Sequence, residues 1–167
     1  MMSQVPRVVP HDGGEKIKVH GGWLSFLAVG GQTNGAYALI ETANEPSTGV
    51  RLHVHEREDE TWFILEGEYV FQVGSQTISA HAGDYLFGPR SVPHSYANRS
   101  ASVAKALIMV TPAGFEGFWR ESARLGPDVA AHEALSLKYG VKLVPYREVK
   151  SRVTETVPIP TSEAKKD

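Results

Sequence analysis

Between about residues 16 and 110, short apolar runs alternate with positions rich in Gly, Pro, Asn and Ser. The runs cover residues 23–29, 36–40, 50–55, 62–65, 69–73, 85–87 and 104–110. Many short strands at regular spacing are typical of an all-β barrel or sandwich. Turn signals such as Glu66-Gly67-Glu68 and Val73-Gly74-Ser75 separate the runs. The pattern therefore predicts an all-β core.

From Pro112 onward the apolar period changes to that of an amphipathic helix. The positions that share one helical face are Phe115, Phe118, Trp119, Ser122 and Leu125. Gly126-Pro127 is expected to end this helix, and Asp128 to cap a second one over about 129 to 138 that stops at Gly140. The aromatic stripe is expected to pack against the barrel, and a lid over a functional site is the alternative.

These changes of pattern divide the chain into four parts. We expect an N-terminal arm over 1–15, a β-barrel over 16–111, a C-terminal helical segment packing on the barrel over 112–150, and a polar, flexible tail over 151–167. No internal repeat of about 20 to 50 residues is visible, so the sequence predicts one barrel unit rather than two.

Alternation along two of the runs separates an inner from an outer face, because residues i and i+2 of a strand point the same way. Arg51, His53 and His55 then share one face, and so do Glu60, Trp62 and Ile64. The opposite faces carry Val50, Leu52, Val54, Phe63 and Leu65. Since these faces are apolar too, something must cover them: the C-terminal helices, a second sheet layer or another subunit. We favour a homodimer.

Composition narrows the class of protein. The chain has 167 residues, enough for one domain with a sizeable core, and a formal net charge of -2, which gives no sign of a nucleic-acid or anionic-membrane partner. It has no cysteine, and therefore no disulfide framework or thiolate chemistry. No apolar run approaches about 18 residues, and no signal-peptide pattern is seen at the N-terminus. The expected location is the cytoplasm.

Three histidines and a glutamate are candidate metal ligands. His53 and His55 lie on one predicted strand, Glu60 on the next, and His94 far along the chain. Three imidazoles and one carboxylate suit first-row divalent metals and leave positions open for solvent or substrate. Ordinary surface histidines are the alternative interpretation of the first pair. Binding is expected to weaken below about pH 6, because the ligand histidines must be neutral.

The spacing around these residues resembles the two cupin motifs. The first motif has His-x-His, four residues, Glu, six residues and Gly, which matches the stretch from His53 to Gly67. The second has Gly, five residues, Pro, four residues, His, three residues and Asn, which matches the stretch from Gly83 to Asn98. Ser91 departs from the usual glycine. The resemblance implies an all-β cupin barrel of the jelly-roll type with C-terminal α-helices, and one metal held by His53, His55, Glu60 and His94.

A longer stretch, from about 50 to 125, resembles cupins related to quercetin 2,3-dioxygenase. The segments that carry this likeness are Leu52-His-Val-His55, Glu58-Asp-Glu60, Leu65-Glu-Gly67, Pro89-Arg90, Val92-Pro-His94 and Thr111-Pro-Ala-Gly-Phe-Glu-Gly-Phe118. Arg51 stands where many relatives have proline. The likeness implies a dioxygenase acting on a flavonol-like or other enolisable aromatic substrate with O2. Glu60 would be both ligand and general base for the metal-bound substrate hydroxyl. Fe, Mn, Co, Ni, Cu or Zn would serve as the metal.

Other functions fit the same apparatus. The main alternative is a non-oxidative metal-dependent cupin, such as an isomerase, lyase, cyclase or hydrolase on a small anionic or polyketide-like substrate. A small-molecule-binding cupin without turnover is the second. A regulator with a cupin sensor would need a helix-turn-helix segment, for which this sequence leaves no room. Oxalate-type cupins are typically secreted, and sugar-nucleotide epimerases usually rely on a His/Asp pair instead of this ligand set.

Three further residues are candidate substrate contacts. Trp62 and Tyr96 alternate with Glu60 and His94, so they should line the pocket with flat aromatic walls, unless both are simply core. Arg51, if it faces inward, would favour an anionic substrate, whereas the plainer interpretation places it in water at a strand end. The histidines interpreted as non-ligands are His11, His20, His81 and His132.

Overall fold

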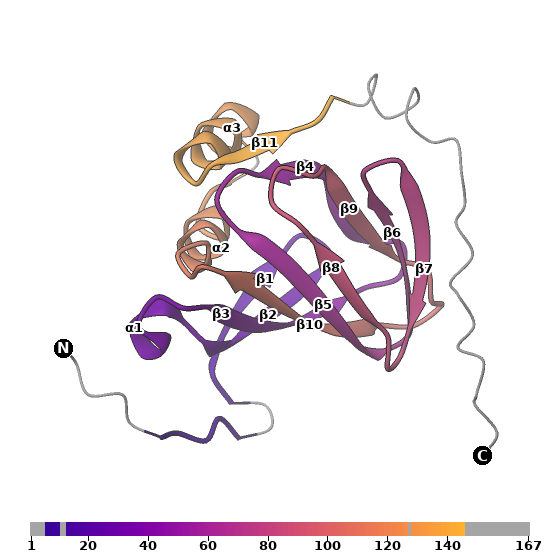
Figure 1. Ribbon diagram of the computed structural model, residues 1–167, viewed down its shortest axis with the longest axis horizontal. Helices are drawn as coiled ribbons and strands as arrows, with labels where there is room; N and C mark the ends of the chain where they lie inside the picture. Colours follow the sequence, from indigo (N-terminus) through magenta and orange to yellow (C-terminus); the bar gives the residue numbers. More distant parts are fainter. Residues whose placement is uncertain (1–5, 11–12, 127, 146–167) are drawn as a thin grey trace, which may run out of the picture.

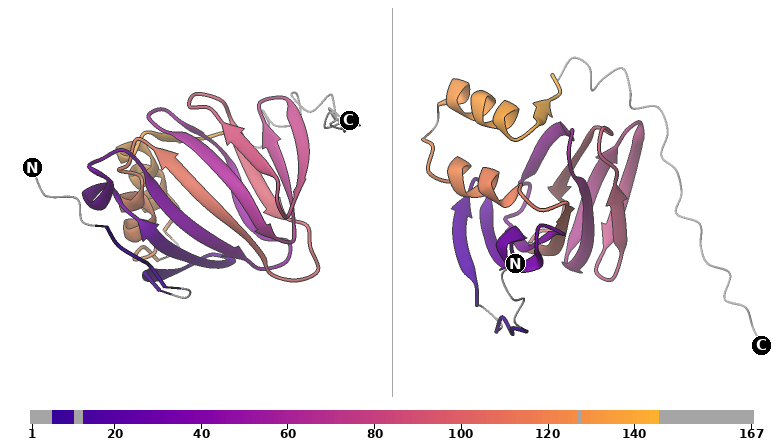
Figure 2. Two further views of the ribbon diagram at one scale, coloured as in Figure 1. Left: turned by 60° about the horizontal axis from the view of Figure 1, so that its bottom comes forward. Right: turned by 60° about the vertical axis from the view of Figure 1, so that its left-hand side comes forward.

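The computed structural model describes residues 6–10, 13–126 and 128–145, and this part of the chain forms two facing antiparallel sheets (Figures 1 and 2). The six-stranded sheet contains, in spatial order, β1 (Glu15–Val19), β2 (Gly22–Ala28), β3 (Ala38–Asn44), β10 (Ala104–Thr111), β5 (Asp59–Glu66) and β8 (Tyr85–Gly88). The five-stranded sheet contains β11 (Val141–Leu143), β4 (Gly49–His55), β9 (His94–Asn98), β6 (Glu68–Val73) and β7 (Gln76–His81). The prediction of an all-β barrel with C-terminal helices is confirmed.

The chain changes sheets at a glycine between β5 and β6. Gly67 has a positive φ of 81°, which side chains rarely adopt, and an added Cβ would lie 2.7 Å from the Cβ of Ala104. β5 pairs with β10 in the first sheet, whereas β6 pairs with β7 and β9 in the second. The tight turn therefore places β5 opposite the strand that carries His94.

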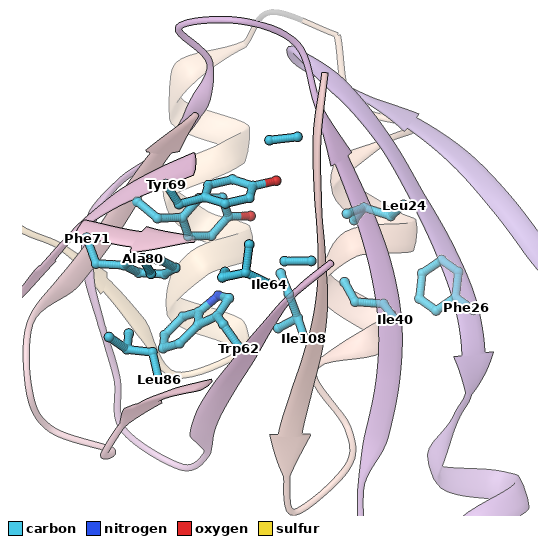
Figure 3. Packing of buried hydrophobic residues seen from close by; sticks show 13 residues of the cluster. Leu24, Phe26, Ile40, Trp62, Ile64, Tyr69, Phe71, Ala80, Leu86 and Ile108 are labelled. Atoms are coloured by element: carbon cyan, nitrogen blue, oxygen red, sulfur yellow. The ribbon is translucent and has the colours of Figure 1, made fainter. Parts of the chain in front are cut away.

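Alternating side chains fill the space between the sheets. Buried and half-buried positions alternate without interruption along β10, as the period of two requires for a sheet with one inner face. Trp62, Ile64, Phe71 and Ile108 lie in the middle of this cluster (Figure 3). Each is at most 2% exposed, so the core sits between the two sheets and not beneath the helices.

A second set of buried side chains is polar and lies at one end of the barrel, which we call the amide end (Thr42, Asn44, Tyr69 and Asn98). Asn44 Oδ1 accepts hydrogen bonds from Thr42 Oγ1 (3.1 Å) and from the Tyr69 hydroxyl (3.0 Å). Asn98 Nδ2 donates to the carbonyls of Asn44 (2.9 Å) and Ser102 (2.8 Å). The hydrogen bonds within this set pair these polar groups with one another.

The helices are α1 (Gly30–Thr33), α2 (Glu116–Ser122) and α3 (Val129–Lys138). Asp128 caps α3 as predicted, because its carboxylate accepts a hydrogen bond from the Ala131 amide at 3.1 Å. α2 ends at Ser122, three residues before the last apolar position of the predicted stripe, Leu125. Just before α2, Phe115 packs with Ala38 and Val110 at the opposite end of the barrel from the amide end.

The outward face of β5 and β8 is not covered within one chain. Phe63 is 43% exposed, Phe87 51% and Tyr85 64%. The C-terminal helices and the second sheet therefore leave these three side chains open, whereas Leu52, on the expected outer face of β4, is buried. No helix in this part of the chain is long and apolar enough to cross a membrane.

Candidate metal centre

The four predicted ligands come together inside the barrel. His53 and His55 are on β4, Glu60 is on β5, and His94 is the first residue of β9. One ligand atom from each lies within 4.8 Å of the others. Metal bonds of about 2.1 Å place neighbouring ligand atoms about 3 to 4 Å apart, so this spacing is close to that of a bound site. Residues far apart in sequence thus form one compact group.

Strand pairing explains how the ligands meet. His53 is directly opposite His94 in the β4–β9 pair, and Glu60 is opposite Val110 in the β5–β10 pair. Both pairs lie at the end of the barrel away from the amide end, which we call the metal end. The two sheets therefore present their ligands at the same level.

Each ligand histidine uses its outer ring nitrogen for a hydrogen bond. His53 Nδ1 lies 2.7 Å from the Arg51 carbonyl and His94 Nδ1 lies 3.0 Å from the Val92 carbonyl. His55 Nδ1 lies 3.3 Å from Glu58 Oε2. Since carbonyls and carboxylates only accept, Nδ1 carries the proton in each ring, and each neutral ring keeps a lone pair on Nε2.

These lone pairs point at one another and at a carboxylate. His53 Nε2 lies 3.2 Å from His55 Nε2, and Glu60 Oε2 lies 3.0 Å from His94 Nε2 and 3.4 Å from His55 Nε2. Four acceptors without a donor between them repel one another, whereas a divalent cation would satisfy all four. The donor set therefore fits a transition metal.

The ionisation of the group agrees with this fit. Burial, together with the positive charges that His94 and His55 carry when protonated, lowers the pKa of His53 to about 3. Burial acts to raise the pKa of Glu60, but the contact with His94 and the positive charges that the three histidines carry when protonated outweigh it and leave the pKa lowered. Neutral imidazoles and an ionised carboxylate are the forms that bind metal.

Aromatic rings enclose the ligands. The ring centroid of Phe115 lies 4.4 Å from that of His55, and Trp62 lies 5.3 Å from His94. Trp62 and Tyr96, two predicted substrate contacts, are buried with centroids 6.3 Å apart. Phe115 belongs to the predicted aromatic stripe, so that stripe both packs on the barrel and reaches a ligand.

Trp62 has an unusual feature: its indole Nε1 is buried and has no hydrogen-bond partner among the described residues. A Cβ added to Gly88 would lie 2.8 Å from the Cζ3 atom of this ring, so Gly88 lets the benzene half of the indole lie against β8. The nitrogen is on the opposite side of the ring, toward the middle of the core cluster (Figure 3).

The third predicted substrate contact, Arg51, is exposed, unlike the buried Trp62 and Tyr96. The β4–β9 register shifts between Val50 and His53. A β-bulge breaks the alternation on which the shared face of Arg51 and His53 was predicted. Of the histidines interpreted as non-ligands, His20, His81 and His132 are outside the ligand group, and His11 lies outside the described residues.

Two contacts of the ligand loops were not predicted. Arg90 binds Asp59 through both carboxylate oxygens at 3.1 and 2.8 Å, and these hydrogen bonds lower the pKa of Asp59 to about 2. The pair joins the segment before Glu60 to the segment before His94. Glu58, which accepts from His55, was also missed, although a carboxylate three residues after a ligand histidine is a visible signal.

Comparison with known proteins identifies the family. Residues 42–110 match the family model described as a cupin domain. The protein contains a single cupin domain. Quercetin 2,3-dioxygenase of Bacillus subtilis (strain 168) is 26% identical over 116 residues, which cover 70% of this chain and 34% of that protein. The HTH-type transcriptional regulator PuuR of Escherichia coli (strain K12) is 28% identical over 89 residues, which cover 53% of this chain and 48% of that protein.

The chain therefore spans less than half the length of both curated relatives. Among solved structures, KdgF from Halomonas sp. has a TM-score of 0.61 at 12% identity and covers 68% of this chain and 99% of its own. At this identity the likeness extends to the fold alone. The cupin fold is thus shared among proteins with different names.

Proposed function

We propose that this cupin domain is a metal-dependent dioxygenase that acts on a flavonol-like or other enolisable aromatic substrate. The observation that carries the proposal is the convergence of three imidazole Nε2 atoms and Glu60 Oε2 in an aromatic enclosure. The likeness to quercetin 2,3-dioxygenase, over 70% of this chain, supports the choice of reaction.

Each ligand has a part in this proposal. The bound metal would be Fe, Mn, Co, Ni, Cu or Zn and would supply a Lewis acid that makes a substrate hydroxyl more acidic. Glu60 is ionised at neutral pH and accepts the hydroxyl proton. Burial beside Trp62 alone would raise the pKa of Glu60, but the net shift is downward. Glu60 is therefore a weak base that needs an acidified substrate.

The surrounding side chains bind and shield the substrate. Trp62 and Tyr96 provide flat walls for an aromatic ring, and Phe115 keeps bulk water from His55. In the reaction, one O2 supplies two oxygen atoms to the substrate, the heterocycle opens, and one ring carbon with one oxygen leaves as carbon monoxide.

The test is oxygen uptake with headspace carbon monoxide detection. Protein loaded in turn with each of the six metals is given quercetin, and His94→Ala is the matched control. Uptake with one carbon monoxide per O2, absent in the variant, supports the proposal. Bound metal without uptake overturns it.

A second candidate is a cupin that binds a small molecule without turnover. The lowered pKa of Glu60 favours it, because a weak base suits a metal ligand better than a proton acceptor. Tight binding of an enolisable compound by metal-loaded protein, with neither consumption of that compound nor oxygen uptake, would establish this alternative.

We also propose that a second copy of the chain covers the exposed face of β5 and β8. Phe63 on β5 is directly opposite Tyr85 on the edge strand β8, and Phe87 is two residues further along β8. All three side chains point outward. An uncharged apolar patch can meet its own copy without like-charge repulsion, which a symmetric dimer requires. Such patches are rarely left open to water.

Sedimentation tests this dimer. The full chain is expected to sediment as a dimer at micromolar concentration, and Phe87→Glu as a monomer with unchanged metal content. Phe87 is remote from the ligands, since its side chain points away from the barrel interior. A monomeric parent chain would refute the proposal.

A further inference from the structure

One ligand histidine is held differently from the other two. The outer nitrogens of His53 and His94 donate to backbone carbonyls, whereas that of His55 meets the Glu58 carboxylate at 3.3 Å. We propose that Glu58 is a positioning residue of the metal centre: it fixes the tautomer of His55 and strengthens its Nε2 as a ligand. The inference rests on the metal centre of the proposed function.

The loop that carries Glu58 is anchored on both sides. The Ser91 amide donates to the His55 carbonyl at 2.7 Å, and the Glu56 amide donates to the Gly140 carbonyl at 2.9 Å. Asp59 follows Glu58 directly and is bound by Arg90. These contacts fix the backbone that positions the Glu58 carboxylate beside His55. Only 5% of Glu58 is exposed.

A buried carboxylate is costly in this place unless something offsets its charge. Taking an ionised carboxylate out of water costs several kcal/mol, and a neutral imidazole N–H returns only part of that. No lysine or arginine is buried among residues 6–10, 13–126 and 128–145. Glu58 and Glu60 place two buried carboxyl groups beside three imidazole rings, and a divalent cation would suit this set of donors.

The ring of His55 does not need Glu58 for its place. It packs edge-on against Phe115 at 4.4 Å and parallel to His94 at 5.5 Å. Packing leaves open which nitrogen carries the proton, and only an acceptor at Nδ1 decides that. The specific contribution of Glu58 is thus the tautomer and the electron density at Nε2, which can be measured apart from folding.

Three variants of the full chain separate these effects. Glu58→Ala removes acceptor and charge, whereas Glu58→Gln keeps a carbonyl acceptor and removes the charge. Glu56→Gln changes an exposed carboxylate in the same loop and is the matched control. The readouts are zinc affinity by chelator competition and the 15N shifts of His55 in the metal-free protein, with near-UV circular dichroism to establish folding.

Glu58→Ala is expected to bind zinc about 10- to 100-fold more weakly and to lose the Nδ1–H preference of His55. Glu58→Gln is expected to keep the tautomer and lose less affinity, and Glu56→Gln to match the parent chain. Parent-like zinc affinity or an unchanged tautomer in folded Glu58→Ala refutes the role of Glu58. If Glu58→Ala does not fold, Glu58→Gln decides: parent-like zinc affinity refutes the contribution of the charge.

The outcomes also separate this inference from the proposed function. Zinc binding that depends on Glu58, in a protein without oxygen uptake, leaves the inference standing and overturns the dioxygenase. A parent chain that binds no zinc refutes both.

Discussion

The metal end and the amide end of the barrel both bury polar side chains, but they treat them in opposite ways. At the amide end, donors face acceptors: the Asn44 side-chain oxygen accepts from two hydroxyl groups, and the Asn98 side-chain nitrogen donates to two backbone carbonyls. At the metal end, four acceptor atoms face one another with no donor between them. The comparison shows which buried polar groups serve the fold and which await a ligand.

The largest expected effect is at the metal end. His94→Ala removes one of four ligands, so metal affinity should fall by more than about 100-fold, beyond the loss expected for an outer hydrogen-bond partner. The metal-dependent rise in the melting temperature should disappear with it. The metal-free variant should lose some stability as well, because removal of the buried His94 ring leaves a cavity beside Trp62. Thermal melts with and without metal measure both, and parent-like metal stabilisation of the variant would contradict this account.

The opposite pattern is expected at the amide end. Asn98 is 0% exposed, and its side chain donates two hydrogen bonds and accepts one from the Ser100 amide at 2.7 Å. Asn98→Ala should lower the free energy of unfolding by about 2 to 4 kcal/mol, since it leaves buried backbone groups unpaired. Metal content per folded chain should not change. Urea denaturation measures the free energy of unfolding, and metal analysis measures the metal content. A loss of metal with no loss of stability would contradict the structural role of the amide end.

Acid should lower the stability of the metal-free chain through the metal end. Because the pKa of His53 is lowered to about 3, the folded metal-free chain binds fewer protons than the unfolded chain between that pH and about 6.5. Stability from this group is complete above about pH 6.5 and is lost as the pH falls toward 3, by at most about 1.4 kcal/mol per pH unit. In His53→Gln, the free energy of unfolding of the metal-free chain should depend less on pH in this range. Urea denaturation at several pH values measures this dependence, and equal slopes for both proteins would show that His53 does not have this lowered pKa.

A smaller effect is expected at Trp62. Trp62→Phe keeps an aromatic ring but reduces the area of the proposed wall, so the Michaelis constant for quercetin should rise about three- to tenfold. The turnover number of the metal-loaded protein should change less. Trp119→Phe, on α2, is the control for loss of an indole. An unchanged Michaelis constant would mean that Trp62 does not line the substrate site.

The smallest effect is expected at Arg51. Its side chain is exposed, so Arg51→Ala should change the association rate of an anionic substrate by less than about threefold, and only at low salt. Stopped-flow binding at two salt concentrations tests this. A large, salt-independent loss of affinity would place Arg51 in the site itself.

The sequence predicted the features that depend on spacing. The two histidines two residues apart, the six residues before Gly67 and the late His94 were enough to predict the barrel and the four residues that the structure brings together as possible metal ligands. Likewise, Asp128 marked the start of α3. Local patterns of this kind are visible because strand and helix periods repeat within a few residues.

The sequence could not show what depends on pairing across the fold. The bulge before His53 exposes Arg51, and a short strand, β11, follows the helices and pairs with β4. Burial alone would raise the pKa of Glu60, yet the pKa is lowered because His94 and His55 lie beside it. Each outcome depends on neighbours that are distant in sequence and that no single segment reveals.

The pairing of β11 with β4 also sets an order of events during synthesis. Val141 lies opposite His55 and Leu143 opposite His53, so β4 has an open edge until the chain has been made that far. All four ligands have emerged from the ribosome well before this strand. We expect a nascent chain stopped after Asn98 to expose β4 as an unprotected edge that is prone to pair with other chains. The sheet that carries three of the four candidate ligands would then be complete only after residue 143 has been made.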